Sequence, residues 1–154
     1  MHGVEITQGA FLADQNVVQR LNRTLRRAVA ANHTCTHLLH AALRSVLGDH
    51  VKQAGSLVSS DHLRFDFSHI SPLTSEERQQ VEDLVNKAIS EDLKLEVSVM
   101  DYRTAVQEKV AMALFGEKYT DAVRVVDIPE ISLELCGGTH LQSTAQALSF
   151  CIHP

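Results

Sequence analysis

The chain has 154 residues, of which 44% are hydrophobic and 21% are charged, and its formal net charge is -5 at pH 7. This length and composition predict one soluble globular domain with a sizeable core. The negative charge argues against a stand-alone, non-specific nucleic-acid binder, which needs a basic surface, but it allows a local pocket for one RNA end.

The sequence also carries signals about its cellular compartment. No apolar run approaches the roughly 18 residues that a membrane-spanning helix needs, and the first residues lack the pattern of a secretory signal. Three cysteines, at positions 35, 136 and 151, do not form a disulfide framework. We therefore expect a cytoplasmic protein with no membrane partner.

The first third of the chain is predicted to be mainly helical. Residues 1–14 are expected to be an extended lead-in, and residues 15–30 a helix whose arginines lie on a solvated face rather than on RNA phosphates. Asn32 is a fair N-cap for a second helix over residues 33–47, which stops at Gly48.

Strands and helices then mix without a regular β–α–β rhythm. Thr74 and Glu77 stand at capping-box spacing, which predicts a helix that opens there. Asp101 can cap a short helix that ends at Gln107, and residues 115–121 have the composition of a turn. Alternating apolar residues predict strands at residues 62–68, 93–100, 122–128, 131–136 and 147–152. We therefore predict an α+β fold with an antiparallel sheet packed against helices.

Two pairs of potential metal ligands share one spacing. His33 and His37 lie four residues apart, so a helix would place both imidazoles on one face, roughly 6 Å apart at Cβ. Cys136 and His140 have the same separation, and the two glycines between them allow a tight loop. Together the pairs supply three imidazoles and one thiolate, the tetrahedral set that Zn²⁺ prefers. A closed site with four protein ligands is structural by default, which is the main objection to an enzyme.

Neighbouring histidine and cysteine side chains are weaker ligand candidates. Cys35 falls on the opposite helix face and is expected to be a small buried residue. His40 shares the face of His33 but lies one turn beyond the pair, so a supporting or packing role is expected. Cys151 alternates with apolar residues, as in strand packing.

Six stretches, in this order, resemble the editing domain of alanyl-tRNA synthetases: "NHTCTHLLHAAL", "HVKQAGSLV", "LRFDFSH", "VEDLVNKAI", "AMALFGEKY" and "LELCGGTH". They span residues 32–140, and the preceding residues resemble the segment that joins the family's small barrel to this domain. The resemblance implies a lead-in over residues 1–30 and an editing domain over residues 31–154. The same fold serves free-standing alanyl-tRNA editing proteins and, more distantly, threonyl-tRNA synthetases.

The resemblance implies hydrolysis of the ester that joins a misattached serine or glycine to the 3′ adenosine of alanine tRNA. Such a second site is needed because a pocket shaped for alanine cannot exclude glycine and rejects serine poorly. The partner would be the 3′ aminoacyl end of tRNA(Ala), and no aminoacylation is expected from this chain. The implied Zn²⁺ ligands are His33, His37, Cys136 and His140.

Other candidate residues follow from the same resemblance. Gln53 matches a family glutamine near the aminoacyl pocket, although a solvated turn residue is an equal alternative. The hydroxyls of Thr34 and Thr36 could bond the seryl oxygen or bond back to helix carbonyls.

Three charged residues complete the candidate set. Arg64 could meet the terminal phosphate or adenosine, with a salt bridge across strands as the alternative. Asp66 alternates with Arg64 on the same predicted strand. Glu134 shares a strand face with Cys136 and could orient a ligand imidazole, or it could be plain surface.

The sequence departs from the family near its end. Ala145 and Leu148 occupy positions where the family has glycines, and the family continues with a further strand after Pro154. We therefore expect an open sheet edge, covered by a partner or by the remainder of a synthetase. Two alternatives stay open: a non-catalytic, zinc-stapled module that binds RNA or protein, and a threonyl-type editing domain without metal.

Overall fold

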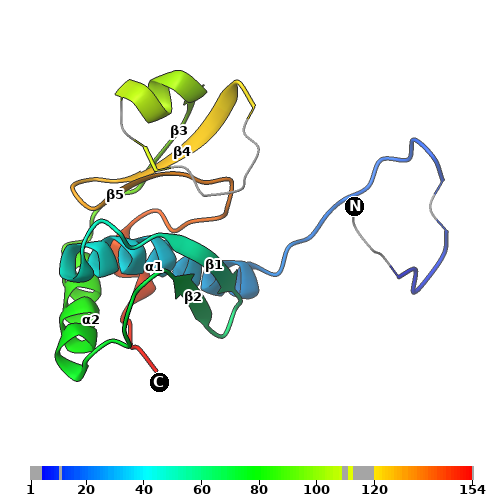
Figure 1. The fold of residues 1–154 in the computed structure, drawn as a ribbon. Helices are drawn as coiled ribbons and strands as arrows, with labels where there is room; N and C mark the ends of the chain where they lie inside the picture. Colours follow the sequence, from blue (N-terminus) through cyan, green and yellow to red (C-terminus); the bar gives the residue numbers. More distant parts are fainter. Residues whose placement is uncertain (1–4, 11, 109–110, 113–119, 154) are drawn as a thin grey trace.

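The computed structural model describes residues 5–10, 12–108, 111–112 and 120–153 (Figure 1). Within these residues the α-helices are α1 (Arg23–Leu47) and α2 (Ser75–Ser90). One antiparallel sheet has two strands, β1 (Gln53–Val58) and β2 (Leu63–Phe67). The other has three in the order β3 (Glu96–Asp101), β4 (Ala122–Ile128) and β5 (Ser132–Leu135). The predicted α+β class is confirmed. None of the helices in the described ranges is long and apolar enough to cross a bilayer.

Helix α1 begins later than predicted and is one element rather than two. Residues 15–22 lie outside it, and the N-cap is Asn22, whose side chain accepts a hydrogen bond from Leu25 N at 3.1 Å. Asn32, the predicted cap, lies inside α1 and donates to the carbonyl of Ser59 at 2.9 Å. No glycine or proline separates the two predicted helices, so the helix continues through Asn32.

Most predicted elements after α1 are present. The capping box at the start of α2 forms, because Glu77 N donates to Thr74 Oγ1 at 3.1 Å and Thr74 N donates to Glu77 Oε2 at 2.8 Å. Asp101 caps the short π-helical segment Thr104–Glu108 by accepting from Arg103 N at 2.8 Å. The predicted turn at 115–121 lies largely outside the described residues. Strand β1 was not predicted, and it pairs with β2 around an irregularity between Gln53 and Gly55.

The strand predicted at residues 147–152 is wrong. This segment follows a 3₁₀ turn, and its backbone bonds to side chains of α2 instead of to another strand. Phe150 N donates to Asn86 Oδ1 at 2.9 Å, and Asn86 Nδ2 donates back to Phe150 O at 2.8 Å. Ile152 N donates to Glu82 Oε2 at 2.7 Å. A side-chain amide and a carboxylate thus satisfy the backbone groups that a strand ladder would otherwise pair.

The core has two parts. The larger part lies between α1, α2 and the β1–β2 hairpin and includes Leu38, Leu43, Val51, Val81 and Val85. The second covers one face of the three-stranded sheet and includes Ala105, Ala111, Val123, Val125 and Leu135. Because neighbouring residues of a strand point to opposite faces, the other face of that sheet presents Arg124 and Glu134, and Glu134 points towards α1.

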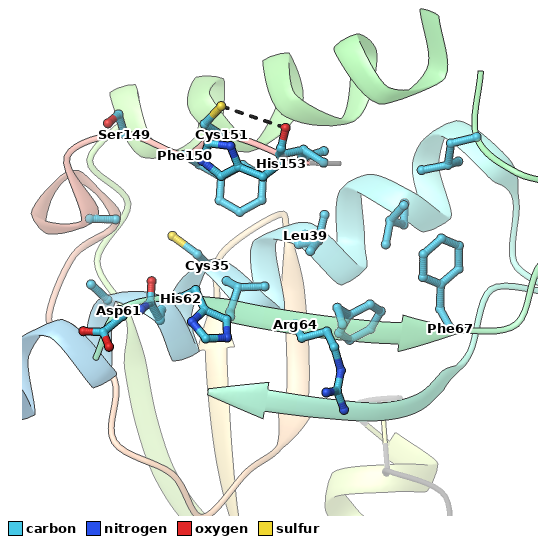
Figure 2. A pocket seen from close by; sticks show the side chains of 18 residues that line it. Cys35, Leu39, Asp61, His62, Arg64, Phe67, Ser149, Phe150, Cys151 and His153 are labelled. Carbon is cyan, nitrogen blue, oxygen red and sulfur yellow. Dashed lines mark hydrogen bonds between the residues drawn. The ribbon is translucent and has the colours of Figure 1, made fainter. Parts of the chain in front are cut away.

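A cavity of about 620 Å³ lies between α1, β2 and the C-terminal segment (Figure 2). Its apolar lining includes Leu39, Phe67 and Phe150, and Arg64 stands at its edge. Cys35 also faces it, and burial raises the pKa of this thiol to about 11, as expected for a packing residue. Cys151 is exposed, so its predicted strand packing is wrong.

Candidate metal centre

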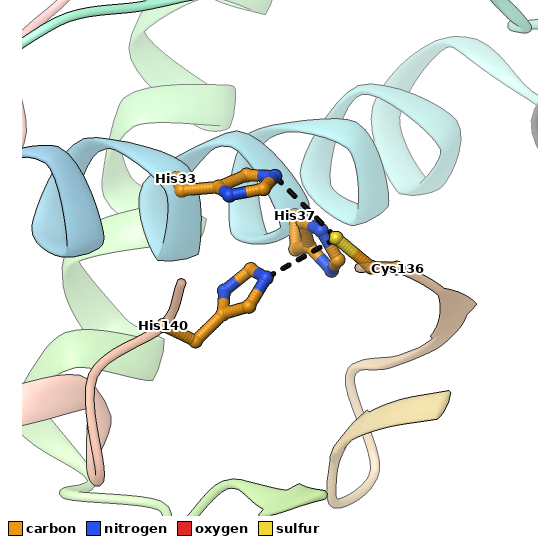
Figure 3. Close-up of side chains that lie close together, drawn as sticks. All are labelled: His33, His37, Cys136 and His140. Atoms are coloured by element: carbon orange, nitrogen blue, oxygen red, sulfur yellow. Dashed lines mark hydrogen bonds between the residues drawn. The ribbon is translucent and has the colours of Figure 1, made fainter. Parts of the chain in front are cut away.

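Four side chains from distant parts of the sequence meet between α1 and the loop after β5 (Figure 3). His33 and His37 project from one face of α1, and Cys136 and His140 face them from the loop. One donor atom from each residue lies within 4.8 Å of the donor atoms of the others. Cys136 Sγ is 3.5 Å from His33 Nε2 and 3.3 Å from His140 Nε2. Sulfur and nitrogen ligands around one tetrahedral zinc ion stand roughly 3.5 Å apart, so the group could hold a metal ion.

The close approach of the loop to α1 requires a glycine at one of its two glycine positions. A Cβ atom at Gly138 would overlap the imidazole ring of His33. A Cβ atom at Gly137 would meet no atom within 4 Å. Gly138 is therefore the residue that lets the loop carry Cys136 and His140 up to the helix.

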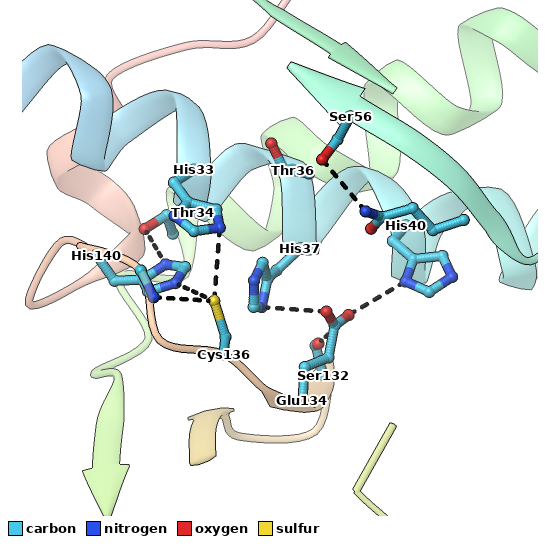
Figure 4. Close-up of polar contacts among 12 residues, drawn as sticks. His33, Thr34, Thr36, His37, His40, Ser56, Ser132, Glu134, Cys136 and His140 are labelled. Carbon is cyan, nitrogen blue, oxygen red and sulfur yellow. Dashed lines mark hydrogen bonds and ion pairs between the residues drawn. The ribbon is translucent and has the colours of Figure 1, made fainter. Parts of the chain in front are cut away.

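Each imidazole also has a polar neighbour (Figure 4). His140 Nδ1 lies 3.2 Å from Thr34 Oγ1, and His33 is hydrogen-bonded to the backbone of Thr139. His37 Nδ1 lies 3.5 Å from Glu134 Oε2. If the Nδ1 atom of His140 carries the proton and donates a hydrogen bond to Thr34 Oγ1, the Nε2 lone pair stays free to bind a metal ion on the side of Cys136.

Glu134 is the centre of a buried polar network rather than a surface residue. It is 3% exposed, accepts a hydrogen bond from Ser132 Oγ at 3.0 Å and lies 3.2 Å from His40 Nδ1. Burial by itself would raise the pKa of Glu134, but the contacts with His40, His37 and Ser132 outweigh it and lower that pKa. A carboxylate that stays ionised here can orient the His37 ring, which was one of the two alternatives that the sequence left open for Glu134, and its burial removes the other, a plain surface residue.

The histidines of the cluster are held neutral. Burial is the main cause that lowers the pKa of His33 to about 4 and that of His140 to about 2, and the neighbouring imidazoles add to it. Burial also lowers the pKa of His37, against the opposing charge of Glu134. Neutral imidazole is the form that binds a metal ion, so the three rings are ready for ligation at neutral pH.

The two candidate threonines point their hydroxyls inward. Thr34 is 0% exposed, and its Oγ1 accepts from Leu141 N at 3.1 Å in addition to its contact with His140. Thr36 Oγ1 donates to the carbonyl of Asn32 at 2.8 Å, the helix back-bond that was the stated alternative. Both hydroxyls therefore have partners within the protein.

The remaining candidates lie on the β1–β2 hairpin and outside the ligand cluster. Gln53 begins β1, and its Nε2 donates to Ser56 Oγ at 3.2 Å. Arg64 and Asp66 form an ion pair along β2, with Arg64 Nε 3.0 Å from Asp66 Oδ1 and side chains 62% and 45% exposed. The salt bridge of Arg64 therefore lies within one strand, whereas the sequence analysis gave a salt bridge across two strands as the alternative.

Sequence reasoning missed two residues of this region, Arg124 and Ser132. Arg124 Nη1 donates to the carbonyl oxygens of Cys136 at 2.6 Å and Gly138 at 2.8 Å. The available signal was a lone arginine in the apolar strand "AVRVVDI". Its partners depend on the β4–β5 register, which alternation within one strand does not give.

Comparisons with known proteins point to one family. The family described as "Threonyl and Alanyl tRNA synthetase second additional domain" matches residues 123–152. The alanine–tRNA ligase of Oleidesulfovibrio alaskensis is 59% identical over 152 residues, which is 99% of this chain and 17% of that protein. The alanine–tRNA ligase of Thermotoga maritima is 53% identical over 146 residues, 95% of this chain and 17% of that protein.

The α+β fold and the matched segment are those of a domain that accompanies threonyl- and alanyl-tRNA synthetases. Within that class, the chain belongs with the alanyl-tRNA synthetases, as a domain related to their editing region. It spans only 17% of the length of these relatives.

Proposed function

We propose that this chain is a zinc-dependent aminoacyl-tRNA deacylase that removes serine or glycine from the 3′ end of tRNA(Ala). The observation that carries the proposal is the convergence of His33, His37, Cys136 and His140, whose donor atoms lie within 4.8 Å of one another. The named relatives are alanine–tRNA ligases, which supports a substrate in the form of a charged alanine tRNA.

The donor set fits Zn²⁺ on chemical grounds. Three neutral imidazoles and one thiolate combine borderline nitrogen with soft sulfur, and their separations suit one small tetrahedral ion. A bound zinc ion would supply Lewis acidity that polarises the ester carbonyl or holds the aminoacyl group.

The surrounding residues would hold and orient these parts. Thr34 lies beside the His140 ring and Glu134 beside the His37 ring, so their contribution to catalysis would be positional. Gln53 is the candidate for sensing the seryl hydroxyl, and Thr36 becomes available only if its bond to the helix carbonyl is exchanged. Arg64, with Asp66 holding its guanidinium, is the candidate contact for the terminal phosphate or adenosine, because it is exposed and cationic.

We also propose residues 31–154 as the deacylase unit and residues 1–30 as its lead-in. The boundary falls inside α1, so the two parts are joined by continuous helix. The partners would be the aminoacylated RNA end and the remainder of a synthetase, covering the sheet edge.

A second function is favoured by one observation. His37 is only 4% exposed, and four protein ligands fill a tetrahedral site, which is typical of structural zinc. A non-catalytic, zinc-stapled module that binds RNA or protein has this same geometry.

A deacylation assay separates these functions. Zinc-loaded protein is incubated with Ser-, Gly- and Ala-tRNA(Ala), and we expect release of serine and glycine but not alanine. Cys136→Ala should lower the rate more than about 100-fold, because removal of a ligand exceeds the effect of removing its supporting contacts. Cys151→Ala, at an exposed cysteine, is the matched control. Intact Ser- and Gly-esters after incubation with folded, zinc-loaded protein would favour the stapled module, and hydrolysis without metal would favour a threonyl-type site.

A further inference from the structure

We propose that Arg124 is a positioning residue of the metal centre: its guanidinium holds the loop that carries Cys136 and His140 in a shape ready for the metal. The inference rests on the proposed function in so far as that function places a metal ion at this cluster.

The contacts of Arg124 are specific to this loop. A single nitrogen, Nη1, donates to two carbonyl oxygens, those of Cys136 at 2.6 Å and Gly138 at 2.8 Å. The backbone of the same residue receives a bond from the loop, because Cys136 N donates to Arg124 O at 3.0 Å. The loop is therefore bound at both ends of its glycine pair by one residue of β4.

The glycine pair makes this restraint necessary. Glycine has more backbone freedom than any other residue, so an unrestrained Gly-Gly loop would lose much conformational entropy on binding a metal. The carbonyls that Arg124 holds lie on either side of Gly137. If Arg124 fixes them before the metal arrives, the entropic cost falls on folding instead of on metal binding.

The position of Arg124 beside the cluster has an electrostatic cost once a metal ion is bound. A guanidinium close to a bound dication would be repelled, and Arg124 is close to the cluster, since its Nη1 lies 2.6 Å from the carbonyl oxygen of Cys136. Two anions offset this cost when zinc is bound, the Cys136 thiolate and the buried Glu134. Against two charges on zinc and one on Arg124, these anions leave the centre with one net positive charge, which suits an anionic RNA end.

Arginine and lysine are not equivalent in this position. The planar guanidinium directs the two N–H groups of Nη1 at fixed angles, whereas a lysine ammonium sits on a flexible stem. We therefore expect Arg124→Lys to retain part of the restraint on the loop. Arg124→Met keeps an apolar stem but removes all donors, so it should retain none of that restraint.

The test measures zinc affinity by competition with a chromophoric chelator. Arg124→Met should weaken zinc binding about 10- to 100-fold, the range for contacts that support metal ligands, and Arg124→Lys should fall between it and wild type. Arg44→Met is the matched control, because Arg44 Nη1 likewise donates to two backbone carbonyls, those of Asp49 and Val51, but at a turn outside the cluster. Arg44→Met should leave zinc affinity unchanged.

A second readout is independent of the metal. Amide hydrogen exchange of zinc-free protein should show faster exchange at Gly138 and its neighbours in Arg124→Met, while the amides of α2 stay protected. Equal zinc affinities in Arg124→Met and wild type, with equal loop exchange, would overturn the proposal. Failure of wild-type protein to bind zinc would instead count against the proposed function, and the loop exchange would still test the role of Arg124.

Discussion

At the scale of single residues, the metal centre depends on one glycine. We expect Gly138→Ala to lose the site, because the added methyl group would occupy the space of the His33 ring. Such overpacking costs about 1–3 kcal/mol or forces the loop away from α1. Gly137→Ala should retain the site, since its methyl group has open space around it.

Thermal unfolding and zinc titration of the two glycine variants check this prediction. The pair shares a loop and a substitution, so a difference between them reports space alone. Equal zinc affinity in both variants would show that the loop does not approach His33 as described.

A second residue-scale prediction concerns Glu134. Replacement by glutamine keeps the shape of the side chain but removes the charge that faces His37 and His40. We expect Glu134→Gln to weaken zinc binding about 10- to 100-fold, because the His37 ring loses the negative charge that lies beside its Nδ1 atom. Glu96→Gln, at an exposed glutamate of β3, is the control, and chelator competition is the measurement. A Glu134→Gln variant that binds zinc like wild type would reduce Glu134 to a packing role.

At the scale of elements, the C-terminal segment is joined to α2 through Thr144. Its Oγ1 donates to Ala88 O at 2.6 Å and accepts from Leu93 N at 2.9 Å, and the side chain is fully buried. Thr144→Val keeps the volume but leaves both backbone groups without their partner. The expected loss is about 1–3 kcal/mol, the usual cost of unsatisfied buried polar groups.

Urea unfolding of Thr144→Val beside Ser143→Ala measures this loss, since the Ser143 side chain makes no capping hydrogen bond. An unchanged midpoint in Thr144→Val would mean that the hydrogen bonds of the Thr144 hydroxyl do not stabilise the fold. This prediction does not involve the metal, so the unfolding experiment can use zinc-free protein.

At the scale of the whole molecule, the histidine cluster links folding to pH. The pKa of His33 falls from 6.5 to about 4 in the folded, metal-free chain, and that of His140 falls to about 2. Between these values and 6.5 the unfolded chain binds more protons than the folded chain, so stability decreases as pH decreases. The loss should begin near pH 6.5 and continue to about pH 4 and below.

Urea midpoints of zinc-free protein, taken between neutral pH and about pH 4, check this dependence. A His33→Gln variant should show a shallower decline, because glutamine does not titrate. Midpoints that are constant across this range would contradict buried, neutral imidazoles. Zinc-loaded protein should resist the decline until protons displace the metal.

Much of the fold follows from local patterns. The capping box of Thr74 and Glu77 gave the start of α2, and alternation gave β2 and the three strands of the second sheet. The wrong predictions concern segments whose conformation is set by hydrogen bonds to residues far away in the sequence. Asn32 resembles a cap but tethers α1 to Ser59, and the segment around Phe150 alternates like a strand but bonds to the Asn86 side chain.

The sequence by itself determined that His33 and His37 share a helix face and that Cys136 and His140 flank a glycine pair. These relations depend only on the helical period and on the freedom of glycine, which act within a few residues. Tertiary structure decided that the two pairs meet, that Glu134 is buried between His37 and His40, and that Arg124 binds the loop. The physical reason is that strand register and helix–sheet packing are set by contacts between residues far apart in the chain, which no local spacing encodes.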